Sequence, residues 1–198
     1  LWRKVTDALS HSHTRDAAAK ALQAGGTIAL PFMESVFNDE STPKSTRMKL
    51  ARIFGNIRGE NAIRILSGKI STPENDLRET VLAALTECGF SGANVQDEIQ
   101  AQVKKEAQDA RMLYSALREI ESKDEMGLAA QAIRIELKHV RERLFHLMSF
   151  VYDRKAILNA RRVITQRNEA KIPYAIETLD TILPRDAKQI LLPLAEDV

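Results

Sequence analysis

The chain contains 198 residues with a formal net charge of +2, which results from 29 basic and 27 acidic side chains. This near-balance argues against a dedicated nucleic-acid binder, and the aromatic content of 5% provides poorly for base stacking. The single cysteine, Cys88, excludes an internal disulfide, and because the sequence has no Asn-x-Ser/Thr sequon we expect a cytoplasmic location. No apolar run approaches the length that spans a bilayer. Because the chain opens on Leu1, we expect a processed product or, in preference, a piece of a longer protein.

A helical pattern recurs every thirty-odd residues in the first half of the chain. An arginine is followed, at spacings of three and four, by apolar or small residues, and the pattern begins at Arg15, Arg47 and Arg78. Self-similarity at this period is typical of repeat architectures, in which helix pairs stack and bury a continuous core. We favour the interpretation that the three arginines bridge adjacent repeats through an acid or a carbonyl. The alternative is that they line an inner face suited to an acidic peptide.

Glycine and proline residues divide this repeating part into short helices. Gly25 and Gly26 end the first helix, and Pro31 suits the first turn of the second because its missing N–H would have no partner there. We predict about three helix pairs within residues 1–94. The predicted helices are residues 13–25, 27–37, 44–58 and 60–70, followed by one between Pro73 and Gly89.

The period changes after Asn94, where two long helices replace the short pairs. Apolar residues at spacings of three and four predict a polar helix over residues 95–121. A turn at residues 122–125 leads into a helix from Met126 to Tyr152, whose apolar residues alternate steps of four and three as in a coiled-coil seam. This helix would extend about 40 Å. Because the linker is short, we predict an antiparallel hairpin over residues 95–152.

The last part of the chain returns to short helices. Asp153 is placed to cap a helix over residues 154–166, and the apolar spacing of the early repeats reappears at residues 175–182. Residues 190–194 resemble the second helix of the first repeat. We therefore predict an all-α chain in which residues 153–198 continue the repeats of residues 1–94 and the hairpin is inserted between them. All three parts are expected to form one continuous solenoid domain.

The alternation of an arginine helix with a Leu-Pro-apolar helix resembles HEAT-type repeats over residues 13–90 and 153–198. This resemblance implies a right-handed α-α superhelix of the HEAT and armadillo type. A further set of residues resembles the cytoplasmic HEAT-repeat segment of large bacterial proteins that contain a membrane domain similar to ATP/ADP translocases and often a cyclic-nucleotide-binding module. The set comprises Leu144, Phe145, His146, Leu147, Met148, Tyr152, Asp153, Ile157, Ala175, Glu177, Leu179, Asp180, Leu183 and Pro184. It implies a setting at the cytoplasmic face of a membrane protein and no particular site.

A basic segment near the end of the chain is the main candidate binding site. Its six cations, opposed only by Glu169, are Arg154, Lys155, Arg161, Arg162, Arg167 and Lys171. Spacings of seven residues align four of them as basic stripes along one helix, suited to phosphates, anionic lipid headgroups or an acidic partner. The competing interpretation is a solvated face neutralised by acids near the hairpin turn, namely Glu119, Glu121, Asp124 or Glu125.

Two pairs of residues on the second long helix have the spacing of metal ligands. Glu136 and His139 match one half of a di-iron site, but the chain has no second Glu-x-x-His. His139 and His146 are seven residues apart, and we expect them to be partly exposed imidazoles on one helix face. We therefore predict no metal site and no cofactor.

No catalytic motif occurs in the sequence, so we predict a non-enzymatic protein-interaction or regulatory scaffold. Its partner would be another protein or a neighbouring domain of the same polypeptide, with nucleic acid disfavoured and membrane association only indirect. The hairpin is expected to offer a contact face made of Leu137, Val140, Leu144 and Leu147. The alternative is a HEAT-like DNA-binding protein or alkyl-base DNA glycosylase-type enzyme, which only the basic segment supports. A carrier of a small ligand, held between the hairpin and the solenoid, is a third option.

Overall fold

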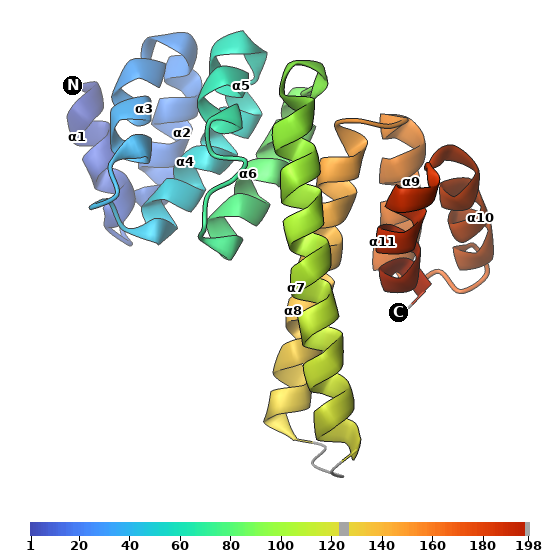
Figure 1. Cartoon of the computed structure of the whole chain (residues 1–198). Helices are drawn as coiled ribbons and strands as arrows, with labels where there is room; N and C mark the ends of the chain where they lie inside the picture. The colour runs from blue at the N-terminus through green and yellow to red at the C-terminus, as the bar shows by residue number, and fades with distance from the viewer. Residues whose placement is uncertain (123–126, 197–198) are drawn as a thin grey trace. The chain divides into compact units, whose positions relative to one another are not determined.

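The computed structural model describes residues 1–122 and 127–196, and every regular element in this part of the chain is a helix (Figure 1). The prediction of an all-α chain is confirmed for these residues. The chain divides into two compact units, Leu1–Phe90 and Ser91–Val198. Among the described helices, none combines the length and the apolar character that crossing a bilayer requires.

The first unit consists of short helices joined by tight turns. Most of them match the predicted ranges within a few residues, because glycines and prolines mark the ends. The predicted helix at residues 27–37 instead begins at Leu30, after a 3-10 turn at Gly26–Ile28, and a short first helix was not predicted. The α-helices are α1 (Trp2–Asp7), α2 (Arg15–Gly25), α3 (Leu30–Asn38), α4 (Lys44–Ile57), α5 (Gly59–Ser67) and α6 (Asn75–Cys88).

The core of the first unit forms around α4, which packs against α2, α3, α5 and α6. The rings of Phe37 and Phe54 meet edge to face with their centroids 5.3 Å apart. Gly55 allows α4 and α6 to approach closely, because a Cβ at this position would lie 3.0 Å from the Cβ of Ala84. The apolar stripes that the repeat pattern indicated are therefore the surfaces that the helices bury against one another.

The recurring arginines share one structural role. Each guanidinium donates a hydrogen bond to a backbone carbonyl in the turn that precedes its own helix, and so holds that turn in place. The bonds join Arg15 Nε to Leu9 O at 3.4 Å, Arg47 Nε to Thr42 O at 3.0 Å, and Arg78 Nη1 to Thr72 O at 2.6 Å. In each repeat the bonded carbonyl lies five or six residues before the arginine. This shared hydrogen bond explains why the arginine recurs with the repeat.

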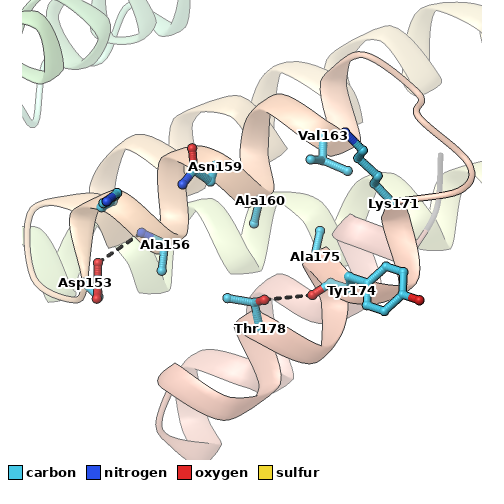
Figure 2. Close-up of a pocket in the computed structure, with 10 residues that line it drawn as sticks. Asp153, Ala156, Asn159, Ala160, Val163, Lys171, Tyr174, Ala175 and Thr178 are labelled. Carbon is cyan, nitrogen blue, oxygen red and sulfur yellow. Dashed lines mark hydrogen bonds between the residues drawn. The ribbon is translucent and has the colours of Figure 1, made fainter.

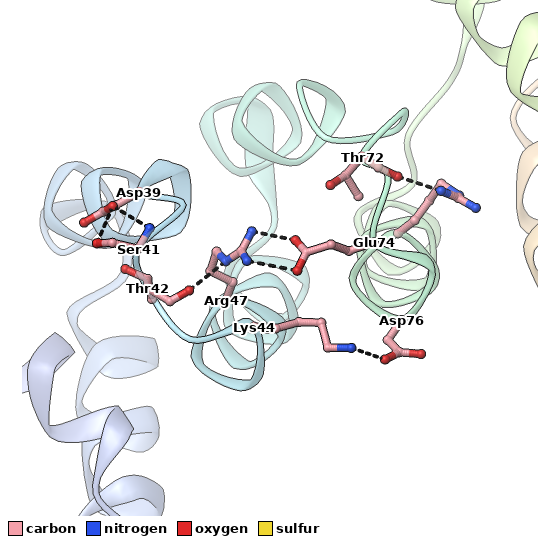
Figure 3. A network of polar contacts seen from close by, with 9 residues as sticks. Asp39, Ser41, Thr42, Lys44, Arg47, Thr72, Glu74 and Asp76 are labelled. Atoms are coloured by element: carbon pink, nitrogen blue, oxygen red, sulfur yellow. Dashed lines mark hydrogen bonds and ion pairs between the residues drawn. The ribbon is translucent and has the colours of Figure 1, made fainter.

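Arg47 also links its own repeat to the next one (Figure 3). Its two Nη atoms lie 2.7 Å and 3.0 Å from the carboxylate oxygens of Glu74, which directly precedes α6. Lys44 and Asp76 form a second, exposed ion pair between the same helices. For Arg47, these contacts confirm the interpretation that the recurring arginines bridge adjacent repeats through an acid or a carbonyl, whereas the carbonyl bonds of Arg15 and Arg78 stay beside their own helices.

The second unit contains the long hairpin and three shorter helices. They are α7 (Gln96–Ser122), α8 (Leu128–Ser149), α9 (Arg154–Thr165), α10 (Ile172–Ile182) and α11 (Arg185–Glu196). The predicted turn at residues 122–125 lies largely outside the described residues. The prediction that the second long helix reaches Tyr152 is wrong, because α8 ends at Ser149. Asp153, four residues later, has a non-helical ψ of 98°. Its side chain accepts a hydrogen bond from Ala156 N and caps α9, so the chain leaves the helical conformation between α8 and α9.

Helices α7 and α8 lie antiparallel and side by side, as the short linker predicted (Figure 1). Helix α8 also packs against α9 and α11, and α10 packs against the same two helices. Many apolar residues of the hairpin are buried, with the exposed fraction of Ile99, Val140 and Leu144 at zero. The hairpin is therefore the scaffold on which the rest of this unit is placed.

Candidate functional site

The four residues proposed as a contact face on the hairpin belong to the core instead. Leu137, Val140, Leu144 and Leu147 are all buried, the first at 5% exposure and the others at zero. Helices of the same unit cover them, because α8 packs against α7, α9 and α11. The prediction that these side chains meet a partner is therefore wrong for the folded chain.

A buried polar network crosses between α7 and α8. Arg143 is almost completely buried, and its Nε donates to Glu106 Oε2 at 2.9 Å while Nη2 donates to Glu136 Oε1 at 3.0 Å. Gln102 donates to the second oxygen of Glu106 at 3.0 Å. Glu136, half of the Glu-x-x-His pattern, thus binds an arginine. Within the described residues no group of three His, Cys, Asp or Glu side chains is arranged to hold a metal ion.

A second polar cluster joins α8 to α9. Arg161 Nε donates to Glu142 Oε2 at 2.6 Å, and the hydroxyl of Thr165 donates to Glu142 Oε1 at 2.8 Å. His146 is buried beside this cluster, and burial, assisted by the positive charge of Arg161, lowers its pKa to about 3. The expectation of a partly exposed imidazole at His146 is wrong, because α9 covers this face of α8.

The six basic residues do not form one continuous stripe. Arg161 is directed at α8, where Glu142 neutralises it, whereas Lys155 and Lys171 line a groove and Arg167 lines a different pocket. Arg154 is half-buried and Arg162 is exposed, with its Nη2 3.4 Å from Asn159 Oδ1. The acid that pairs with Arg161 is not one of the four suggested near the hairpin turn. Of those four, the side chains of Glu121, Asp124 and Glu125 lie outside the described residues.

Two of these cations, Lys155 and Lys171, line the groove between α9 and α10. Figure 2 shows Lys171 at the end of the groove opposite Asp153. The groove has a volume of about 620 Å³ and is lined by small side chains, including Ala156, Ala160 and Ala175. Because alanine fills little space, the facing sides of the two helices leave the groove open. Tyr174 lies at the groove with 70% of its surface exposed. This arrangement combines apolar surface, an aromatic ring and positive charge, which is a composition suited to binding.

Sequence reasoning found the lysines of the groove but missed both polar clusters. One signal was available: Gln102 and Glu106 fall on the apolar stripe of α7, three residues after Ile99 and Val103 respectively. A carboxylate at such a position is expected to pair with a cation, because burying an unpaired charge costs much free energy. The identity of that cation depends on how α7 and α8 align, which the spacing alone does not specify.

Comparison of the chain with protein-family models, with curated proteins and with solved structures finds no match in any of the three.

Proposed function

We propose that the chain is a non-enzymatic protein-interaction module built of HEAT-type helix pairs. The bonds of Arg15, Arg47 and Arg78 to turn carbonyls support the repeat interpretation, because they give the recurrence a common physical cause. In this hypothesis the helix pairs stack as in a right-handed superhelix. In the setting that the second resemblance implies, the partner would be a neighbouring domain of the same polypeptide.

The groove between α9 and α10 is the observation that carries the proposal. Two lysines, Lys155 and Lys171, line the groove with several alanine side chains. Asp153 also lines it, and its carboxylate accepts a hydrogen bond from Ala156 N. Tyrosine is enriched among the residues that dominate binding at interfaces, and Tyr174 is largely exposed here. The groove therefore offers an apolar contact area with positive charge at its border.

The occupant that fits this groove is a short partner helix with apolar and acidic residues on one face. Its apolar side chains would pack against Ala156, Ala160 and Ala175, which line the groove. Its carboxylates would pair with Lys155 and Lys171. Laying an amphipathic helix into a groove between two helices is a common mode of peptide recognition.

Selection from a displayed library of amphipathic helical peptides tests the proposal. We expect the wild-type chain to enrich peptides with acidic residues beside apolar anchors. Changing both groove lysines, Lys155→Glu and Lys171→Glu, should shift the enriched peptides from acidic to basic. Thr178→Trp places a large ring in the groove at an exposed position and should weaken the selected peptides at least about tenfold, which corresponds to about 1.4 kcal/mol.

The matched control carries the same change of net charge in the first unit. Lys4 and Lys20 are exposed on α1 and α2, so Lys4→Glu with Lys20→Glu should leave the enriched peptides unchanged. Circular dichroism verifies that each variant retains its helix content. The assignment of this groove is contradicted if the groove variants enrich the same peptides as the wild type. It is also contradicted if the control pair changes the enriched peptides as much as the groove pair does.

A further inference from the structure

A second pocket lies within the second unit, on the side of the hairpin where α7 and α8 meet. It has a volume of about 650 Å³ and receives side chains from both long helices, together with Arg167 and Leu194. Pockets of about 300–1,000 Å³ are typical of small-molecule sites. This pocket is separate from the groove between α9 and α10, with which it shares no lining residue.

The lining of this pocket, which we call the cationic pocket, is strongly positive. Five of its eleven lining residues are basic, and none of the eleven is acidic: the basic ones are Arg118, Arg134, Lys138, Arg141 and Arg167. Arg141 is buried, and its Nη1 donates to the backbone carbonyl of Leu194 at 3.2 Å, which orients the guanidinium. The other four side chains are exposed and line the pocket.

The acids of α8 are directed away from the cationic pocket. The helix contains two, and each binds an arginine that does not line the pocket: Glu136 pairs with Arg143, and Glu142 pairs with Arg161. Glu106 of α7 also pairs with Arg143. Helix α8 thus separates its charges, with carboxylates in the two buried clusters and Arg134, Lys138 and Arg141 along the pocket.

We propose that the cationic pocket binds a small organic anion carrying two or more phosphate groups. Arginine presents a planar fork of donors that matches phosphate oxygens, and four of the five cations are arginines. The remaining wall provides a surface for the organic part of the ligand, because Tyr114, Leu117, Ile135 and Leu137 also line the pocket. This site is independent of the proposed peptide groove.

Isothermal titration calorimetry with two probes, inorganic tripolyphosphate and adenosine diphosphate, tests the proposal on the full chain. We expect saturable binding of both at one site, weaker at high salt because the contacts are ionic. Adenosine diphosphate should keep more of its affinity at high salt, because its ring can contact the apolar wall. Arg118→Glu with Lys138→Glu should lower the affinity for both probes at least about tenfold.

The control variant has the same change of net charge at the other site. Lys155→Glu with Lys171→Glu alters the groove between α9 and α10 and should leave phosphate binding within about twofold of the wild type, since the pockets share no residue. Absence of saturable binding by either probe overturns the proposal. An equal loss in both charge variants overturns it too, because it shows a response to net charge alone. Tighter binding of an acidic peptide than of either probe overturns the assigned ligand class.

Discussion

Buried arginines have different partners in the two units. In the first unit, Arg47 and Arg78 donate to carbonyls of the turns that precede their own helices, five and six residues earlier in the chain, and Arg47 also pairs with the half-exposed carboxylate of Glu74. In the second unit, Arg143 of α8 instead binds two carboxylates, one of them 37 residues away on α7. The turn bonds are local and recur with the repeat, whereas the fully buried pair of Arg143 and Glu106 needs two helices in register.

This difference indicates where each unit is most sensitive to substitution. Removing a side chain that bonds to a carbonyl leaves a neutral polar group without that hydrogen bond. Removing a carboxylate beside Arg143 leaves a buried positive charge, which is far more costly. Because Trp2 is the only tryptophan and lies in the first unit, its fluorescence reports that unit separately, while circular dichroism reports both.

The largest expected effect is at Glu106, which is fully buried against Arg143. Glu106→Leu should lower the free energy of unfolding of the second unit by about 3–5 kcal/mol, because breaking a buried ion pair leaves an uncompensated charge. Urea titration followed by circular dichroism measures this loss. The transition seen by Trp2 fluorescence should stay within about 0.5 kcal/mol of the wild type.

A double variant separates the cost of an unpaired charge from the cost of lost packing. Glu106→Leu combined with Arg143→Met replaces the pair by apolar side chains of similar size and should recover most of the lost stability. If the double variant is less stable than Glu106→Leu alone, the network stabilises the hairpin by itself, and our explanation of the single variant is wrong.

The next effect is at Arg78, the corresponding buried arginine of the first unit. Arg78→Met keeps the apolar stem but removes the hydrogen bonds to Thr72 O and Asn75 Oδ1, at 2.6 Å and 2.7 Å. We expect a loss of about 2–3 kcal/mol, within the range for leaving buried polar groups unsatisfied. Urea titration followed by Trp2 fluorescence measures it. A loss larger than that of Glu106→Leu would reverse the order that the comparison predicts.

The local features of the fold could be predicted from the sequence. Apolar spacing and turn residues located α2, α4, α6 and α7, and Asp153 was recognised as a cap because its side chain acts on an amide three residues away. The short α1 was not predicted, since six residues are too few to show a helical period. Each of these outcomes depends on contacts within a few residues of the position concerned.

The candidate sites depend on contacts between helices, and here the sequence was less informative. The seam containing Val140 and Leu144 indicated an apolar face but not that helices of the same chain cover it. Lys155 and Lys171 lie 16 residues apart on either side of a turn, so only the packing of α10 on α9 places them at one groove. The cationic pocket is lined by residues from four segments, namely α7, α8, α11 and the turn after α9, and it was not predicted.

A pH titration gives an effect confined to the second unit. The pKa of His146 is about 3 in the folded chain against an ordinary value of 6.5, so the unfolded chain binds more protons between these values. Stability of the second unit should therefore fall as the pH drops below about 6.5, by up to about 1.4 kcal/mol per pH unit and by about 2 kcal/mol at about pH 5. His146→Gln should flatten this dependence in urea titrations followed by circular dichroism. An unchanged slope would show that other groups cause it.

The smallest effect tests how closely the helices of the first unit pack. At Gly55, a Cβ would lie 3.0 Å from the Cβ and 3.1 Å from the Cα of Ala84, so Gly55→Ala forces α4 and α6 apart. We expect a loss of about 1–2 kcal/mol from overpacking, measured by urea titration with Trp2 fluorescence.

Gly68 provides the matched control, because its nearest neighbours are backbone oxygens at 3.8 Å and 3.9 Å and its φ of −64° suits any residue. Gly68→Ala should be neutral or stabilise the unit by up to about 1 kcal/mol, since alanine restricts the unfolded chain more than glycine does. Ala84→Gly should restore part of the stability lost in Gly55→Ala by removing the methyl group that the new side chain meets. If Ala84→Gly gives no recovery, the close approach of α4 and α6 is relieved elsewhere.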